Sequence, residues 1–318
     1  MNFLKTFLAG VLAFVVGCFL VCYIGMMLLV SMAGLAGSFE KAVSVPDGSI
    51  LEINLDETIT DSPATNPLAE FDFATMTSRH SLPVLKAMGA IEAAAADSRI
   101  RGIYLRLNGA GGIAGSALME ELRGAIADFR QSGKFVVSYN EVYNQGAYYL
   151  ASVADSVYLH PEGGMDWSGL AFNLTFYKGL LDKLDLHAEV FRPTVCKYKS
   201  AVEPYILDRM SDANRLQMQE LVNSIWGTLV RAVSDARGIS PEELNRMADN
   251  LEVVLPEDAL EKGLVDGLLY EDQMNDVFAS YGLEPDAEGH YSFVTLGDYA
   301  AQTGFGAASS LSQPAVAG

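Results

Sequence analysis

The stretch Gly102-Ile103-Tyr104-Leu105-Arg106-Leu107, followed by Asn108-Gly109-Ala110-Gly111-Gly112-Ile113-Ala114-Gly115, indicates the fold of this chain. The first part is predicted to be a strand and the glycine-rich part a turn. Residues 116–131 then predict a helix. A strand, a turn and a helix in this order are typical of a parallel α/β sheet.

The same alternation continues on both sides of this unit. Further strands are predicted at 49–55, 134–139, 156–159 and 188–191. Further helices are predicted at 82–97, 145–154, 174–184, 212–237 and within 256–269, with another starting at Ser240. We expect Ser211 to cap helix 212–237 and Gly238 to end it. Residues 56–79 predict a long loop, and the whole pattern predicts a mainly parallel α/β core.

The N-terminus carries no charge from Thr6 to Phe39. A bilayer core needs roughly 20 apolar residues in a helix, and the apolar core of a cleavable signal peptide has only about 7–15. The run therefore predicts one transmembrane helix. Lys5 precedes it, so the positive-inside rule places the N-terminus in the cytoplasm and the bulk outside or in the periplasm.

The charge of the chain excludes one class of partner. Half of its 318 residues are hydrophobic, and the formal net charge is -19. Nucleic acid needs a basic surface, so we expect no nucleic-acid partner. The acidity also argues against a polybasic membrane-binding patch.

The three cysteines predict no disulfide in the soluble part. Cys18 and Cys22 lie in the apolar N-terminus, and Cys196 stands alone beyond it. Cys196 precedes two lysines, so it is either a reactive thiolate or a small apolar filler.

The glycine-rich turn has two functional interpretations. Backbone N–H groups at a helix N-terminus hold anions. Gly109-x-Gly111-x-x-Ala114 fits a dinucleotide fingerprint, with Glu141 as the acid for a ribose, although Glu141 lies farther along than usual. The same N–H groups could instead form an oxyanion hole. A tight turn that simply needs glycine is compatible with both.

Two other segments could carry chemistry. Cys196-Lys197-Tyr198-Lys199-Ser200-Ala201-Val202-Glu203-Pro204-Tyr205 places two lysines two positions apart. A lysine held partly out of water is a usable general base, whereas a solvated lysine is not. Tyr143-Asn144-Gln145-Gly146-Ala147-Tyr148-Tyr149 is predicted to be a strand-to-helix turn.

These segments resemble the signal peptide peptidase A family, the long form of protease IV in serine peptidase family S49. Lys-Ser-Ala-Val-Glu-Pro at 199–204 is similar to the lysine segment of that family, and the resemblance covers about Gly48 to Leu269. It implies a ClpP/crotonase-like fold and a Ser-Lys dyad in which Lys199 is the general base. No cofactor and no metal are implied.

The resemblance also implies that half of the dyad is missing. In the catalytic repeat of the family, the strand-to-helix turn carries the serine, but Gln145 stands there in this chain. The chain is similar to the N-terminal repeat, with a membrane anchor at 1–40, a peptidase domain at 41–300 and a linker-like tail at 301–318. The implied partners are an apolar signal peptide, the inner membrane, and a ring-like homo-oligomer or a serine-bearing second repeat. Lys199 is expected to lie in a concave site near the Gln145 turn.

Other nucleophile schemes find little support in the sequence. The chain has no Gly-x-Ser-x-Gly elbow. Ser200 follows Lys199 directly and would point to the opposite face of an extended segment. Ser116 and Ser168 have no supporting pattern. The histidines show no metal-binding spacing: His80, His160, His187 and His290.

One group of aromatic residues has two interpretations. It comprises Tyr143, Tyr148, Tyr149, Phe172, Phe176 and Tyr177. These side chains either pack in the core or line a groove for an apolar peptide.

Three functions therefore stay open. The chain is the lysine half of a signal-peptide-degrading serine endopeptidase, a non-catalytic scaffold or peptide-binding half, or an anchored dinucleotide-binding oxidoreductase. Nucleotide titration separates the third function from the others, and a serine-directed fluorophosphonate probe separates the first two.

Overall fold

The computed structural model describes residues 2–38, 44–63, 71–72, 77–78, 81–108, 112–113, 115–191 and 195–303. The chain divides into two units, Met1–Ser44 and Val45–Gly318. The predicted tail from residue 304 onward lies outside the described residues.

The first unit is the helix α1 (Asn2–Ser38). Its segment Lys5–Met27 has a mean hydropathy of 2.6, and the helix is long and apolar enough to cross a membrane. Large apolar side chains such as Phe14 and Phe19 are exposed along it. A helix that is apolar all round is typical of one that lies in an apolar environment.

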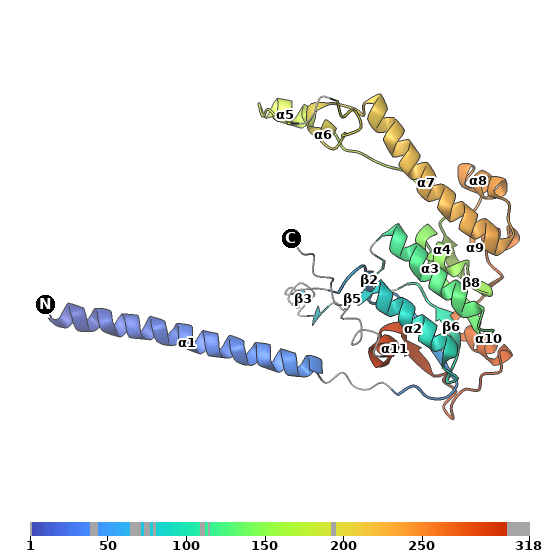
Figure 1. The fold of residues 1–318 in the computed structure, drawn as a ribbon, viewed down its shortest axis with the longest axis horizontal. Coiled ribbons are helices and arrows are strands. Elements are labelled where there is room, and N and C mark those ends of the chain that lie inside the picture. Colours follow the sequence, from blue (N-terminus) through green and yellow to red (C-terminus); the bar gives the residue numbers. More distant parts are fainter. Residues whose placement is uncertain are drawn as a thin grey trace, which may run out of the picture. The chain divides into compact units, whose positions relative to one another are not determined.

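The second unit is built on a parallel six-stranded sheet (Figure 1). In spatial order its strands are β10 (Phe293–Thr295), β1 (Ser49–Ile53), β6 (Ile100–Leu105), β7 (Phe135–Tyr143), β8 (Ser156–Met165) and β9 (Gly267–Leu268). Every neighbouring pair in this sheet is parallel. The predicted parallel α/β core is confirmed.

Side chains alternate between the two faces of the sheet. One face carries Ile50, Tyr104 and Val137, which pack against Met274 and Phe278 of α10. The other face carries residues such as Ile103 and Val136, which are fully buried. The helices α2 and α3 lie on that side and contact each other (Figure 1).

Further helices of the second unit lie between its strands in the chain or after the last of them. They are α2 (Val84–Ala96), α3 (Ser116–Arg130), α4 (Gln145–Ala151), α8 (Pro241–Asp249), α9 (Pro256–Glu261), η2 (Glu271–Gln273), α10 (Met274–Ser280) and α11 (Leu296–Gln302). Two short two-stranded sheets pair β2 (Thr58–Thr60) with β5 (Ser81–Pro83), and β3 (Phe71–Asp72) with β4 (Thr77–Ser78). Part of the predicted loop 56–79 is therefore paired.

The long helix α7 (Asp212–Arg237) begins and ends where the sequence predicts. Ser211 Oγ accepts a hydrogen bond from Asn214 N–H at 3.2 Å, and Gly238 ends the helix in the left-handed region with φ 69°. Two short helices, α5 (Lys178–Lys183) and α6 (Glu203–Ile206), lie near its N-terminal end, and α8 and α9 lie near its C-terminal end (Figure 1).

Two predictions around α5 are wrong. The strand predicted at 188–191 does not form, and the helix predicted at 174–184 is reduced to α5. Residues 186–189 are exposed, and no neighbouring strand pairs with them among the described residues. A strand without a partner leaves its backbone groups to water, so β-branched composition alone does not produce one.

Candidate functional site

The predicted strand-to-helix turn after β7 is formed, and Gln145 is the first residue of the helix that follows it. Asn144 caps α4 by accepting a hydrogen bond from Ala147 N–H at 2.8 Å. Gln145 Nε2 donates to Gly169 O at 2.8 Å, and Gly169 N–H donates to Gln145 Oε1 at 3.0 Å. Both polar atoms of the Gln145 amide are therefore hydrogen-bonded to the backbone after β8. The side chain supplies no hydroxyl.

The glycine-rich turn after β6 is described only in part, because 109–111 and 114 lie outside the described residues. Gly112 N–H donates to Leu55 O at 3.3 Å, and Gly112 O accepts from Ile59 N–H at 2.9 Å. This glycine has φ 87°, a conformation that side chains other than glycine rarely adopt. Its N–H is thus directed to the residues between β1 and β2, and in this chain it is not available to an oxyanion.

Lys199 lines a pocket of about 420 Å³ beside the N-terminal part of α7. Its walls are mainly apolar and come from two chain segments and the helix: Phe172, Leu174, Tyr198, Pro204 and Met218. Lys199 N–H donates to Cys196 O at 3.1 Å, which closes a tight turn around Tyr198. Lys199 thus borders a pocket, but it is itself exposed to solvent, so the expected placement out of water is not seen.

Within this chain, the Lys199 pocket and α4, the helix that begins at Gln145, lie beside different parts of α7. The Lys199 pocket contains Asn214, Gln217 and Met218. Tyr149 of α4 lines a second pocket, of about 250 Å³, together with Ser224 to Leu229. A helix rises about 1.5 Å per residue, so the parts of α7 that line the two pockets are roughly 10–20 Å apart along the helix axis. Gln145 is not among the described residues that surround Lys199, and the expected proximity is not seen within one chain.

The other serines and histidines that the sequence singled out differ in their surroundings, as far as the structure describes them. Ser168 Oγ donates to Asp166 Oδ1 at 2.6 Å, and Ser200 Oγ donates to Gln217 Oε1 at 3.4 Å. Ser116 begins α3 and lines the pocket that contains Tyr149. His160 packs edge-on against Tyr270, His187 and His290 are exposed, and His80 lies outside the described residues. None of these serines is paired with a lysine or histidine by a described hydrogen bond.

The aromatic group divides between the two interpretations. Tyr143, Tyr148 and Tyr149 are buried, and the Tyr148 hydroxyl donates to Leu264 O at 2.6 Å. Phe172 and Tyr177 are 46% and 43% exposed, and Phe172 lines the Lys199 pocket. The α4 aromatics are therefore core residues, whereas Phe172 belongs to an accessible apolar wall. Cys196, which begins the lysine segment, is half-buried.

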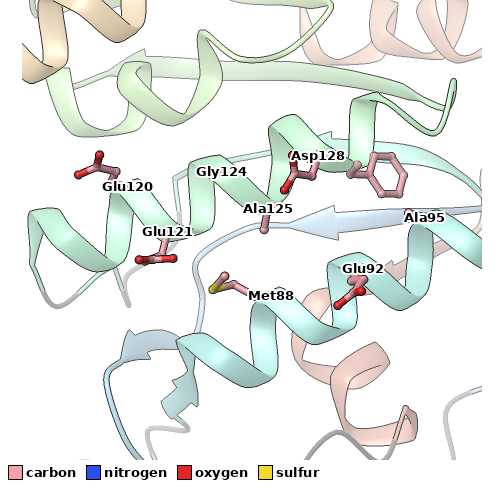
Figure 2. Close-up of a pocket in the computed structure, with 9 residues that line it drawn as sticks. Met88, Glu92, Ala95, Glu120, Glu121, Gly124, Ala125 and Asp128 are labelled. Atoms are coloured by element: carbon pink, nitrogen blue, oxygen red, sulfur yellow. The ribbon is translucent and has the colours of Figure 1, made fainter.

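A larger groove, of about 530 Å³, lies between α2 and α3 (Figure 2). Met88 and Glu92 of α2 face Glu121 and Ala125 of α3 across it (Figure 2). Its other lining residues include two more acidic side chains, Glu120 and Asp128. None of the residues that the sequence singled out for chemistry lines this groove.

A buried polar cluster next to Lys199 was not predicted. Glu203 is 2% exposed and Asn214 is 1% exposed. The Glu203 carboxylate accepts hydrogen bonds from Ser211 Oγ at 2.6 Å, Ser211 N–H at 3.1 Å and Asn214 Nδ2 at 2.9 Å. The sequence gives one sign of this cluster, because Glu203 lies four positions after Lys199 and shortly before the predicted cap Ser211.

Comparisons with known proteins agree with this architecture. The model of peptidase family S49 matches residues 128–281. The chain is 33% identical over 279 residues to Protease 4 of Salmonella typhi, which covers 84% of this chain and 44% of that protein. It is 32% identical over 221 residues to Protease 4 of Haemophilus influenzae, covering 69% of this chain and 35% of that protein.

A plant protein is similar over a shorter range. Serine protease SPPA, chloroplastic, of Arabidopsis thaliana is 30% identical over 181 residues, which is 57% of this chain and 26% of that protein. The chain thus spans less than half the length of these three relatives. Its parallel sheet, with a glycine-rich turn and a strand-to-helix turn after successive strands, defines an α/β protein of the ClpP-like class. The chain belongs to peptidase family S49.

Proposed function

We propose that this chain is the lysine-bearing repeat of a membrane-anchored serine endopeptidase with a Ser-Lys dyad. Lys199 is its general base, and a second repeat, joined in cis or contributed by another chain, supplies the serine. The observation that supports this proposal is the turn after β7: it carries Gln145, whose two amide atoms are hydrogen-bonded to Gly169, at the position where the family resemblance implies a serine in the catalytic repeat. Lys199 meanwhile lines a mainly apolar pocket elsewhere on the same domain.

The chemistry follows from the lysine amine. In its neutral form the Lys199 Nζ takes the proton of the serine hydroxyl, and the serine oxygen attacks the carbonyl carbon of the peptide. The resulting lysine ammonium gives its proton to the departing amine as the C–N bond breaks. Water then hydrolyses the acyl-enzyme, with Lys199 again taking a proton and returning it to the serine oxygen. This cycle needs a hydroxyl within about 2.6–3.2 Å of Nζ, directly or through one water.

The proposed substrate is a cleaved signal peptide, which is an apolar peptide. The walls of the Lys199 pocket support this choice, because Phe172, Leu174 and Met218 offer apolar surface next to the amine. Apolar side chains bind such surfaces by leaving water. Family membership favours peptide hydrolysis over the dinucleotide-dependent oxidoreduction that the glycine-rich turn left open.

The proposed location is the inner membrane, with the N-terminus in the cytoplasm and residues 45–303 on the periplasmic side. The uncharged helix α1 supports the anchor, and Lys5 supports the orientation. A signal peptide released in the membrane would then reach a peptidase held at the same surface.

The membrane anchor can be tested by extraction. We expect the intact chain to stay in the membrane fraction in carbonate at high pH and to require detergent for release, because Lys5–Met27 is long and apolar enough to span the bilayer. A matched chain that begins at Ser44 should be released without detergent. Protease added to the cytoplasmic side should leave residues 45–303 intact. Release of the intact chain in carbonate, or digestion from the cytoplasmic side, would contradict the proposal.

A non-catalytic scaffold is the second candidate function. The two hydrogen bonds between Gln145 and Gly169 favour it, because they stabilise the turn with a side chain that cannot act as a nucleophile. In this case the chain would hold an apolar peptide or a catalytic repeat, and Lys199 would have no proton to transfer.

A serine-directed probe tests the missing hydroxyl. We expect the isolated chain to show no specific fluorophosphonate labelling and no turnover of an apolar peptide. Ser168 and Ser200 donate to acceptors that are not bases of a dyad, and the nucleophile turn carries Gln145. Labelling and turnover should appear when a serine-bearing repeat is joined in cis or added in trans. A Lys199→Ala chain combined with the same repeat is the matched control and should remain inactive.

Two results would overturn parts of this proposal. Labelling of one serine in the isolated chain, with turnover lost when that serine is mutated, would show that the dyad is complete within this chain. Equal activity of the wild-type assembly and the Lys199→Ala assembly would leave the scaffold function as the better account.

A further inference from the structure

Glu203 is a buried acid that the dyad chemistry does not use. It is 2% exposed and lies four residues after Lys199, at the start of α6. A buried carboxylate is costly unless it is hydrogen-bonded and its charge is compensated. Here the first turn of α7 provides that compensation, because Ser211 and Asn214 donate three hydrogen bonds to the two carboxylate oxygens. The N-terminal end of this 26-residue helix also favours a negative charge.

The backbone between Lys199 and Glu203 is tightly turned. Lys199 N–H donates to Cys196 O at 3.1 Å, and Glu203 N–H donates to Ser200 O at 2.9 Å. Two successive turns therefore connect the lysine to the buried acid. With so few residues between them, a displacement of the Glu203 side chain is passed directly to the backbone of Lys199.

The residues that follow Glu203 are also held in place, by contacts with Tyr177. Pro204 O accepts a hydrogen bond from Tyr177 N–H at 2.7 Å, and the Tyr205 ring stacks on the Tyr177 ring with centroids 5.9 Å apart. Glu203 fixes the segment to α7, and the next two residues fix it to the start of α5. The Lys199 pocket is built from these same parts, since Pro204 and Asn214 both line it.

We infer that Glu203 is the positioning residue for Lys199: by binding the first turn of α7, its carboxylate sets where the lysine amine is presented to the incoming serine. This inference rests on the proposed function, in which Lys199 is the general base. A misplacement of about 1 Å in a catalytic group can cost roughly 10²-fold in rate. Glu203 acts through Lys199 and takes no part in the proton transfers.

Three substitutions of Glu203 distinguish the effect of the position of its polar atoms from the effects of its charge and of a loss of folding. Glu203→Asp keeps the charge but withdraws the carboxylate by one C–C bond, about 1.5 Å. Glu203→Gln keeps the length and one acceptor oxygen, and the Ser211 hydroxyl can turn to accept from the new NH₂ group. Glu203→Ala removes all three hydrogen bonds. Glu220→Asp, on the exposed side of the same helix, is the matched control.

The test is the steady-state kinetics of the assembly that contains the serine-bearing repeat. For Glu203→Asp we expect kcat to fall by about 10–100-fold with KM changed less than about twofold. Glu203→Gln should keep kcat within about fivefold, and Glu220→Asp should match the wild type. The folded fraction of each variant is measured by tryptophan fluorescence.

The possible outcomes are distinct. If Lys199→Ala is inactive and a folded Glu203→Asp has wild-type kcat and KM, the inference about Glu203 is wrong and the proposed function stands. If Lys199→Ala keeps its activity, the proposed function itself is wrong. Equal losses in Glu203→Asp and Glu203→Gln that follow the folded fraction would reduce Glu203 to a structural role and overturn the inference. Should Glu203→Ala fail to fold, the other two variants still decide the question.

Discussion

Replacing Lys199 by alanine is expected to abolish peptide hydrolysis by the assembly while leaving the chain folded. A general base contributes about 10²–10⁴-fold to the rate, and more when it also activates the nucleophile. Lys199 lines an open pocket, so its removal creates no cavity in the core. The measurement is kcat/KM for an apolar peptide, with tryptophan fluorescence as the check on folding.

Two lysine variants sharpen this test. Lys199→Arg keeps the positive charge but cannot give up a proton at ordinary pH, so it should be as inactive as Lys199→Ala. Lys197→Ala is the matched control, because Lys197 lies next but one in sequence and its Nζ packs over the Tyr198 ring at 4.8 Å. Lys197→Ala should keep most of the activity. An active Lys199→Arg assembly would mean that the lysine acts only through its charge, and an essential Lys197 would mean that the base is misassigned.

The largest loss of stability is expected from Arg123→Ala. Arg123 of α3 is 9% exposed, and its guanidinium lies 4.8 Å from the centre of the Tyr149 ring. It donates to Ser152 Oγ at 2.9 Å, to Ala232 O at 3.0 Å and to Tyr149 O. One side chain thereby joins α3 to α4 and α7. Its removal takes away these three hydrogen bonds and the contact with the Tyr149 ring, and we expect the free energy of unfolding to fall by about 2–4 kcal/mol.

Urea unfolding of the detergent-solubilised chain measures this effect. Trp167 and Trp226 are suitable reporters, because their ring centroids lie 5.1 Å apart between α4 and α7. Arg246→Ala is the control: Arg246 is 48% exposed and pairs with Glu243 and Glu252, so its loss should change the free energy of unfolding much less than Arg123→Ala. A loss below about 1 kcal/mol for Arg123→Ala would show that α7 is held to α3 and α4 by other contacts.

The anchoring of α7 matters for the proposed chemistry as well. Its C-terminal half is fixed to the sheet domain by Arg123 and by buried residues such as Leu229 and Val233. Its first turn holds Glu203 and so the segment that carries Lys199. We expect substitutions in the two halves to differ in effect. Arg123→Ala should lower stability, whereas Glu203→Asp should lower kcat.

Local signals in the sequence determined most of the regular elements. The apolar pattern and bordering turns predicted β1, β6 and α3 to within about two residues, because burial and glycine turns act over short distances. The limits of α7 were predicted at both ends, since Ser211 and Gly238 form its caps from neighbouring residues alone. The presence of Gln145 at the start of the helix after β7 could also be read directly from the sequence.

Only the tertiary structure decided the features that depend on distant partners. The strand predicted at 188–191 did not form because no other strand lies beside it among the described residues, whereas β10 did form because β1 is its neighbour. The distance along α7 between the Lys199 pocket and α4, and the burial of Glu203 under the first turn of that helix, likewise follow from packing. Hydrogen-bond pairing and burial depend on which segments the fold brings together, and the residue types alone do not contain that information.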